Sequence, residues 1–68
     1  MKHTVRIYNK ENKMVYENIF GSAENAYEEY MENIRVIKKC IGKDEEYTVA
    51  RYNDDVLMTA ETIRGKTK

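Results

Sequence analysis

One stretch of the sequence, between Ser22 and Gly42, has the pattern of an amphipathic helix and limits what the rest of the chain forms. Its apolar residues recur at steps of three and four positions, which places them on one stripe of a helix at about 100° per residue. Ser22 is a good N-cap residue, and Gly42 is suited to end the helix. The residues of the stripe are Ala23, Ala26, Tyr27, Tyr30, Ile34, Ile37 and Ile41.

The charges of this segment agree with its direction as a helix. Acidic residues gather near its start and basic residues in its last turns, where each sign interacts favourably with the helix dipole. Glu24, Glu28 and Glu32 also form an acidic row that resembles a phosphate backbone. Because Arg35 and Lys39 continue the same face, we interpret this row as an ordinary solvated helix face.

Four runs rich in β-forming residues flank the helix, two on each side. Polar turns at 9–13 and 53–55 separate the members of each pair, which predicts two β-hairpins. The predicted fold is therefore α+β, with the order ββαββ: a four-stranded antiparallel sheet with one helix packed on one face. Residues 1–64 form this single domain, and residues 65–68 form a short basic tail. The predicted strands are His3–Tyr8, Met14–Phe20, Tyr47–Tyr52 and Val56–Ile63.

The second hairpin predicts which side chains face the helix. A two-residue turn at Asn53-Asp54 or at Asp54-Asp55 gives the same division of residues between the two faces. The helix side then contains Tyr47, Val49, Arg51, Val56, Met58 and Ala60. The outer side contains Thr48, Ala50, Tyr52, Leu57, Thr59, Glu61 and Ile63.

The first hairpin allows two registers. A two- or four-residue loop places Met14, Tyr16 and Phe20 beside the core residues Val5 and Ile7. A type I turn with a bulge at Asn12 instead brings Val15, Glu17 and Ile19 to that side, because a one-residue slip exchanges the faces. We favour the first register, since a buried Glu17 without a partner is costly.

The outer face that follows from these registers is mixed in character. Apolar residues lie there among charged and polar ones, whereas a sheet face left in water is expected to be more strictly polar. This pattern favours a contact surface, although scattered apolar residues are also ordinary on a small domain. The apolar and aromatic members are Tyr8, Val15, Ile19, Ala50, Tyr52, Leu57 and Ile63.

The composition argues against several functions. Twelve Lys and Arg balance twelve Asp and Glu in the 68 residues, whereas a general nucleic-acid binder normally has a basic surplus. No apolar run approaches the roughly 20 residues of a membrane span. With one Cys, one His and one Ser, most catalytic groupings cannot be assembled, so we expect neither an enzyme nor a bound cofactor. The single cysteine and a polar N-terminus favour a cytoplasmic protein.

Three candidate sites have simpler interpretations. We expect His3 to be an exposed surface histidine and Cys40 a small residue at the edge of the helical stripe. The acidic clusters 44–46 and 54–55 are separated by a strand, on the order of 20–25 Å, and do not form one metal site. We interpret both clusters as solvated turns.

Our leading hypothesis is a non-catalytic module that acts by protein contact, with itself or with another protein. It uses the outer sheet face or an exposed edge strand. Tyr8, Tyr52 and Leu57 are the predicted anchors, with Arg6 as a polar anchor. The alternatives are single-stranded nucleic-acid binding through Tyr8, Tyr52 and Arg6, and small-ligand binding in a pocket between subunits.

The chain combines small size, a lack of catalytic residues and a compact αβ layout. In this general character it resembles the small accessory proteins that phages and other mobile elements encode, including anti-CRISPR and other anti-defence inhibitors. The resemblance implies a protein that acts by binding and blocking, and it assigns no site residues.

Overall fold

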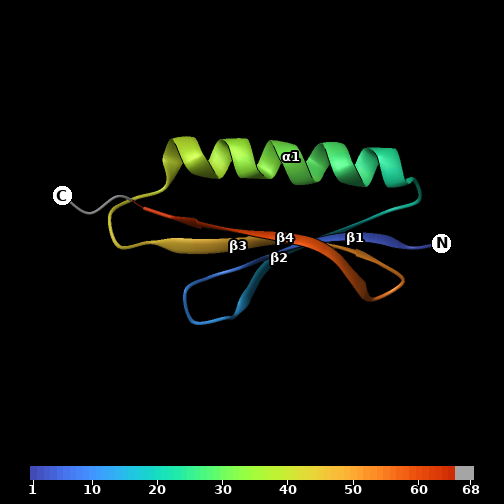
Figure 1. Cartoon of the computed structure of the whole chain (residues 1–68), viewed down its shortest axis with the longest axis horizontal. Coiled ribbons are helices and arrows are strands. Elements are labelled where there is room, and N and C mark those ends of the chain that lie inside the picture. Colours follow the sequence, from blue (N-terminus) through green and yellow to red (C-terminus); the bar gives the residue numbers. More distant parts are fainter. Residues whose placement is uncertain (66–68) are drawn as a thin grey trace.

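The computed structural model describes residues 1–65 and has the predicted element order (Figure 1). The strands form one antiparallel sheet in the order β2-β1-β3-β4, so that β2 and β4 are its edges. This confirms the α+β, ββαββ prediction. The elements are β1 (His3–Tyr8), β2 (Met14–Phe20), α1 (Ala23–Cys40), β3 (Glu46–Asn53) and β4 (Val56–Arg64).

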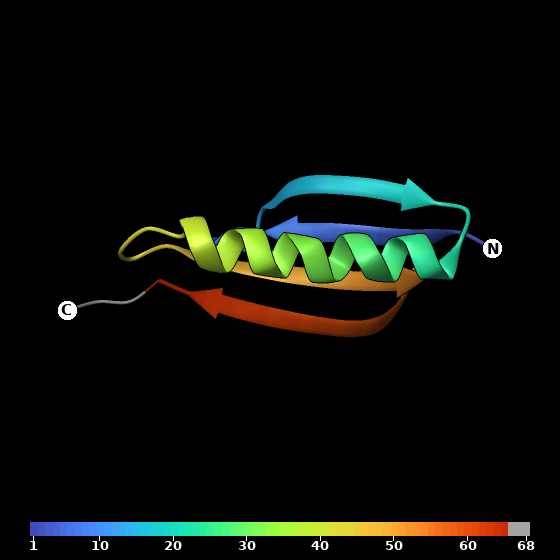
Figure 2. The ribbon, with the colours of Figure 1, turned by 90° about the horizontal axis from the view of Figure 1, so that it is seen from above.

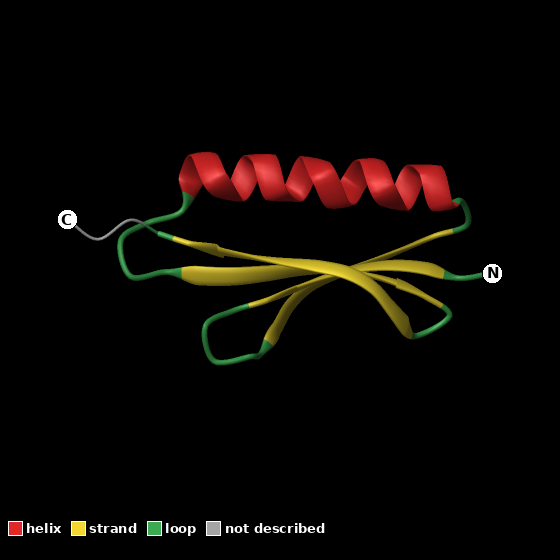
Figure 3. Cartoon of the chain, viewed as in Figure 1, coloured by secondary structure: helices red, strands yellow, loops and turns green. Residues whose placement is uncertain are grey.

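Helix α1 runs along one face of the sheet, above the two central strands (Figure 2). The core lies between them and is built from the middle of the helical stripe and from inward-facing strand residues. The sheet is twisted, and both hairpin turns lie on the side away from α1 (Figure 3). The buried apolar cluster consists of Val5, Ile7, Ala26, Tyr30, Ile34, Val49 and Ile63.

Hydrogen bonds close both ends of α1, near the residues Ser22 and Gly42 at which the sequence predicts the helix to begin and end. The Ser22 hydroxyl accepts from the backbone N–H of Asn25, which confirms Ser22 as the N-cap. At the other end the Ile41 N–H donates to the carbonyl of Ile37, and the chain then becomes extended. The next residue, Gly42, donates its N–H to the Glu45 carboxylate at 2.7 Å, so the helix ends where the sequence predicts.

The edges of the helical stripe are more open than predicted. Tyr27 is 51% exposed, and its ring lies beside the Tyr30 ring and near the Arg51 guanidinium. Cys40 is also exposed. One helix over a four-stranded sheet buries only the centre of its stripe, so residues at the margins of the stripe remain in contact with solvent.

The first hairpin contains two one-residue shifts of the strand register, and their effects on which side chains share a face cancel. Asn12 has φ 66°, and the turn is closed by a hydrogen bond from the Asn9 N–H to the Lys13 carbonyl. Val15 is then an extra residue, because Met14 pairs with Tyr8 while Tyr16 pairs with Ile7. The favoured register is thus confirmed for Tyr16 and Phe20, but Met14 shares a side with Tyr8 and lies on the outer face.

The second hairpin turns at Asp54 and Asp55, whose φ angles of 48° and 69° are those of a left-handed two-residue turn. Farther along, Tyr52 pairs with Leu57 but Arg51 pairs with Thr59, which leaves Met58 as an extra residue. This bulge exchanges the faces for the rest of β4. The predicted sides are therefore wrong for Thr59, Glu61 and Ile63, which face the helix, and for Ala60, which is exposed on the outer face.

The end of the predicted domain is held by the loop that follows the helix. The N–H of Gly65 donates to the Glu45 carbonyl at 2.8 Å. A Cβ at Gly65 would collide with the Gly42 carbonyl, so this close approach requires glycine. The rest of the predicted basic tail, residues 66–68, lies outside the described residues.

The depth of the core predicts a contrast between two helical positions. Ile34 is 5% exposed and Val36 is 44% exposed. We expect Ile34→Ala to lower the free energy of unfolding by about 2–4 kcal/mol and Val36→Ala by less than about 0.5 kcal/mol. Urea denaturation followed by circular dichroism measures both values. Equal losses would contradict the assignment of the buried face.

Candidate outer-face contact site

The four predicted anchor residues lie on one face of the sheet, opposite α1. The register places Arg6 and Tyr8 of β1 on the same side as Tyr52 of β3, and Leu57 of β4 directly opposite Tyr52. We call this side of the sheet the outer face. Its other residues include Thr4, Met14, Glu17, Ile19, Thr48, Ala50, Ala60 and Thr62.

Three of the anchors are in direct contact. The hydroxyl oxygens of Tyr8 and Tyr52 are 3.0 Å apart and share a hydrogen bond. The Arg6 guanidinium carbon lies 4.7 Å from the centre of the Tyr52 ring, which is cation–π geometry. The sequence therefore located a real cluster, and we name Arg6, Tyr8 and Tyr52 the Arg–Tyr cluster.

The positive charge of the cluster is balanced within the face. The Arg6 Nε donates to the Glu17 carboxylate at 2.8 Å, and an Arg6 Nη lies 3.8 Å from the Asp55 carboxylate. The hydrogen bond that Arg6 donates to the Glu17 carboxylate holds the pKa of Arg6 above its usual range. Glu17 faces Arg6 across the β1–β2 pair, which explains how an acidic residue is accommodated on this strand.

The centre of the outer face is closed although no helix covers it. Thr4 is 0% exposed and Ala50 is 2% exposed. Each is small and pairs across the strands with a large member of the Arg–Tyr cluster, Thr4 with Tyr52 and Ala50 with Arg6. The margins are open by contrast, since Met14, Ile19 and Leu57 are each about half exposed. The outer face therefore has a closed centre and apolar edges.

His3 differs from its prediction. It is buried, at 6% exposed, and its Nδ1 is 2.8 Å from the Asn53 side-chain oxygen. The reason is its position on central strand β1, where it lies between Phe20 of β2 and Asn53 of β3 on the helix side. Within residues 1–65, no three or more His, Cys, Asp or Glu side chains form a group that could hold a metal ion.

The acidic residues of the two turns accept hydrogen bonds from backbone N–H groups or adopt turn conformations. The Asp54 carboxylate accepts from the backbone N–H of Lys2 at 2.8 Å. Glu45 accepts from Gly42, and Asp44 has φ 67°, a conformation that Asp tolerates in turns. These contacts agree with the interpretation of both clusters as turns.

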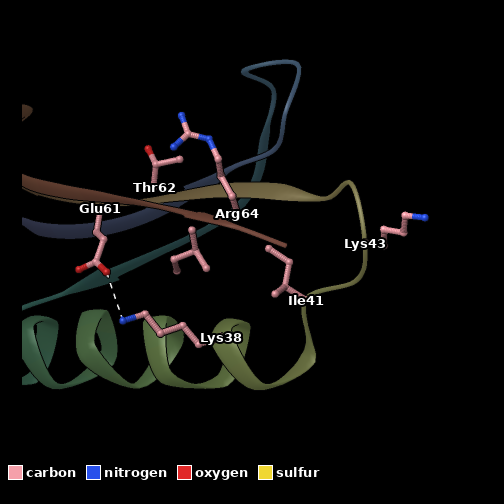
Figure 4. A pocket seen from close by; sticks show the side chains of 7 residues that line it. Lys38, Ile41, Lys43, Glu61, Thr62 and Arg64 are labelled. Atoms are coloured by element: carbon pink, nitrogen blue, oxygen red, sulfur yellow. Dashed lines mark ion pairs between the residues drawn. The ribbon is translucent and has the colours of Figure 1, made fainter. Parts of the chain in front are cut away.

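The sequence reasoning missed a groove between α1 and β4. A cavity of about 640 Å³ lies there, and the Lys38 ammonium meets the Glu61 carboxylate at 3.4 Å across it (Figure 4). The prediction placed Glu61 and Ile63 on the opposite face, so it gave this groove no lining on the strand side. The sequence did hold one signal for this groove: Ile63 is larger and more apolar than Ala60, which favours a register that buries Ile63. The lining residues are Lys38, Ile41, Lys43, Glu61, Thr62, Ile63 and Arg64.

No family model, curated protein or solved structure matches this chain. Within the described part of the chain, no helix has the length and apolar content needed to cross a membrane. The functional proposals below therefore stand on the geometry and charge of the surfaces.

The hydrogen bond between Tyr8 and Tyr52 predicts a pH effect. This bond, followed by burial, raises the pKa of Tyr52 above its usual 10.0. A raised pKa in the folded state means that the resulting stability is fully present below about pH 10 and is lost as the pH rises through the folded pKa. We expect Tyr8→Phe to move the pKa of Tyr52 back toward 10.0, as measured by NMR of the phenol carbons.

Tyr47→Phe is the matched control, because Tyr47 lies on the helix side of the same strand as Tyr52. We expect the pKa of Tyr52 to be the same in this variant as in the unaltered chain. An unchanged pKa of Tyr52 in Tyr8→Phe would contradict the hydrogen bond between the two phenols.

Proposed function

We propose that this chain is a non-catalytic, cytoplasmic protein-binding module and that the outer face is its contact surface. Arg6, Tyr8 and Tyr52 form the centre of that surface, and Leu57 is an apolar anchor at its margin. The strongest support is that Arg6, the cation at the centre of this face, is ion-paired with Glu17 and Asp55 of the same chain, while the apolar residues at the margins stay exposed.

Internal charge balance lowers the cost of covering the face. A charge that is buried without a partner costs several kcal/mol, whereas a paired and hydrogen-bonded charge costs much less. Arg6 is already only 23% exposed in its side chain and is bonded to Glu17. A partner that covers the cluster therefore leaves no new unpaired charge. Tyrosine and arginine are also favoured at the centres of protein interfaces.

The first partner that we propose is a second copy of the chain. The outer face spans the longest and the shortest dimension of the molecule, 43 × 16 Å (Figures 1 and 2), which is of the same order as the ~800 Å² per partner of a standard interface. Because the outer face balances its charge internally, two copies do not repel each other there. Small domains also gain stability when a partner completes their core.

A different protein is the second partner that we propose. In that form the module binds and blocks its target, as the resemblance to phage and mobile-element inhibitors implies. The same neutral face with apolar margins serves this role, because covering it leaves no charge unpaired on this side of the interface.

The same contacts favour protein over single-stranded nucleic acid as the partner. Stacking of bases needs open aromatic rings and a free cation for the phosphates. Here Arg6 stacks on Tyr52 and is bonded to carboxylates, and the two phenols are bonded to each other. The formal net charge of the chain is zero, which adds no attraction for a polyanion.

Self-association through the outer face predicts the effect of a charge at its margin. We expect Leu57→Glu to weaken self-association at least tenfold, because the carboxylate would be buried against the second copy. Analytical ultracentrifugation over a wide concentration range measures this. Val36→Glu is the matched control, since Val36 is 44% exposed but lies on α1.

Two results would count against the self-associating form. The unaltered chain would remain a monomer at millimolar concentration, or Val36→Glu would weaken association as much as Leu57→Glu does. The second result would assign the interface to the helix side.

A further inference from the structure

A second surface, at the β4 edge of the sheet, has features of a binding site for an extended chain. It adjoins the outer face, with which it shares Leu57, and it has its own test. Strand β4 pairs only with β3, and its first three residues are all half exposed or more: Val56 at 62%, Leu57 at 55% and Met58 at 50%. Long apolar edge strands are templates for the addition of another strand.

The opposite edge of the sheet is less suited to this role. The side-chain oxygen of Asn18 accepts from the backbone N–H of Ile19 at 3.0 Å, which occupies a donor that points away from β1. Among the described residues, no side chain accepts in this way from the free edge of β4. The two edges therefore differ, and β4 is the more open one.

The direction of the Ile19 N–H also shows which β4 groups point outward. In antiparallel pairs the hydrogen-bonding side alternates along each strand. The registers carry this alternation from Ile19 of β2 across β1 and β3 to β4. There the backbone N–H and C=O groups of Ala60, Thr62 and Arg64 point away from β3. The bond from the Asp54 N–H to the Lys2 carbonyl fits the same alternation. Beyond the bulge, β4 thus offers three residues in a regular row.

Positive charge lies beside this row on both faces. Lys38 reaches β4 from the helix side, whereas the Arg64 side chain lies on the other side of the strand (Figure 4). In their ion pairs each cation is more exposed than its carboxylate: Lys38 59% against Glu61 46%, and Arg64 73% against Glu46 32%. The groove beside this end of β4 is lined by three basic side chains, Lys38, Lys43 and Arg64, and by one acidic side chain, Glu61.

The other end of the β4 edge is apolar. Tyr27 and Met31 of α1 are 51% and 46% exposed. The Tyr27 ring lies near Arg51, which pairs with Thr59, and the Tyr30 hydroxyl lies 3.5 Å from the Thr59 hydroxyl. These contacts place this part of α1 over the first half of β4. A segment that follows this edge from Val56 toward Arg64 therefore passes apolar side chains first and cations afterwards.

We propose that the β4 edge and the α1–β4 groove bind an extended segment of a different protein, which adds as a fifth strand. The segment carries apolar side chains at alternate positions and acidic side chains where it passes Lys38 and Arg64. Its backbone hydrogen bonds go to Ala60, Thr62 and Arg64. A second copy fits this edge less well, because two-fold antiparallel pairing centred on Glu61 sets two carboxylates opposite each other.

Two synthetic probes test the proposal with the full chain. One is a peptide of alternating Val and Thr that ends in two Glu, and the other has two Lys instead. In ¹⁵N NMR titrations we expect the Glu probe to bind at least tenfold more tightly. We also expect it to shift the amides of Ala60, Thr62 and Arg64 and to slow their hydrogen exchange.

Two variants locate the contact. Thr62→Pro removes an outward N–H that β3 does not use, and we expect it to abolish binding of the Glu probe. Lys38→Gln removes one of the flanking charges and is expected to weaken binding several-fold, which keeps the test decisive if Thr62→Pro does not fold. Ile19→Glu, on the opposite edge, should leave probe binding unchanged while it weakens outer-face self-association.

Several results would overturn the proposal. Equal affinity for the two probes would contradict the charge complementarity. Amide shifts without slowed hydrogen exchange at Ala60, Thr62 and Arg64, or no shifts at saturating probe, would contradict the edge. Slowed exchange of these amides that depends on protein concentration without any probe would assign the edge to a second copy.

Discussion

A single helix covers only one face of a four-stranded sheet, and the rest of this structure depends on that constraint. Helix α1 buries Ala26, Tyr30 and Ile34 against the inward residues of the strands. The chain has no second layer for the other face among its described residues. That face is instead closed at its centre by long side chains from its own strands, which fold over small residues.

The Arg–Tyr cluster is the arrangement that achieves this closure. Tyr52 and Arg6 lie across from Thr4 and Ala50, and both small residues are buried although no other layer covers them. The charge of the cluster is also balanced. The Glu17 carboxylate accepts a hydrogen bond from the Arg6 guanidinium, and the Asp55 carboxylate lies near it. Closing the centre in this way leaves apolar side chains at the margins, and these margins are what a partner meets.

The two proposed surfaces differ in charge, and this difference separates their partners. The outer face is balanced internally, which suits a second copy or another neutral surface. The β4 edge borders a groove in which Lys38, Lys43 and Arg64 outnumber the single acidic residue Glu61, which suits an acidic segment. One small domain thus offers a contact face and an edge, and we propose that the two bind in different ways: by apolar burial on the face and by backbone pairing at the edge.

Local sequence signals predicted much of the fold and of the candidate site. The Ser22 cap, the helical stripe and the polar turns gave the element order, and Arg6, Tyr8, Tyr52 and Leu57 do share one face. The errors in the division of side chains between the two sheet faces came from the bulges at Val15 and Met58. A bulge shifts the two-residue period by one, and it reflects the twist of paired strands rather than a residue type. The Val15 bulge in β1–β2 cancelled the register shift at Asn12. The Met58 bulge in β3–β4 had nothing to cancel it, so Ile63 lies in the core and Ala60 on the outer face.

The most direct test of the account is a series of ¹⁵N NMR spectra recorded over a wide range of protein concentration. The account predicts that the amides of Ile19, Leu57 and their outer-face neighbours shift as concentration rises, while those of Glu32 and Val36 on the exposed side of α1 do not. Spectra that stay unchanged to millimolar concentration, or shifts that map to α1 instead, would contradict the outer face as the surface through which this domain associates.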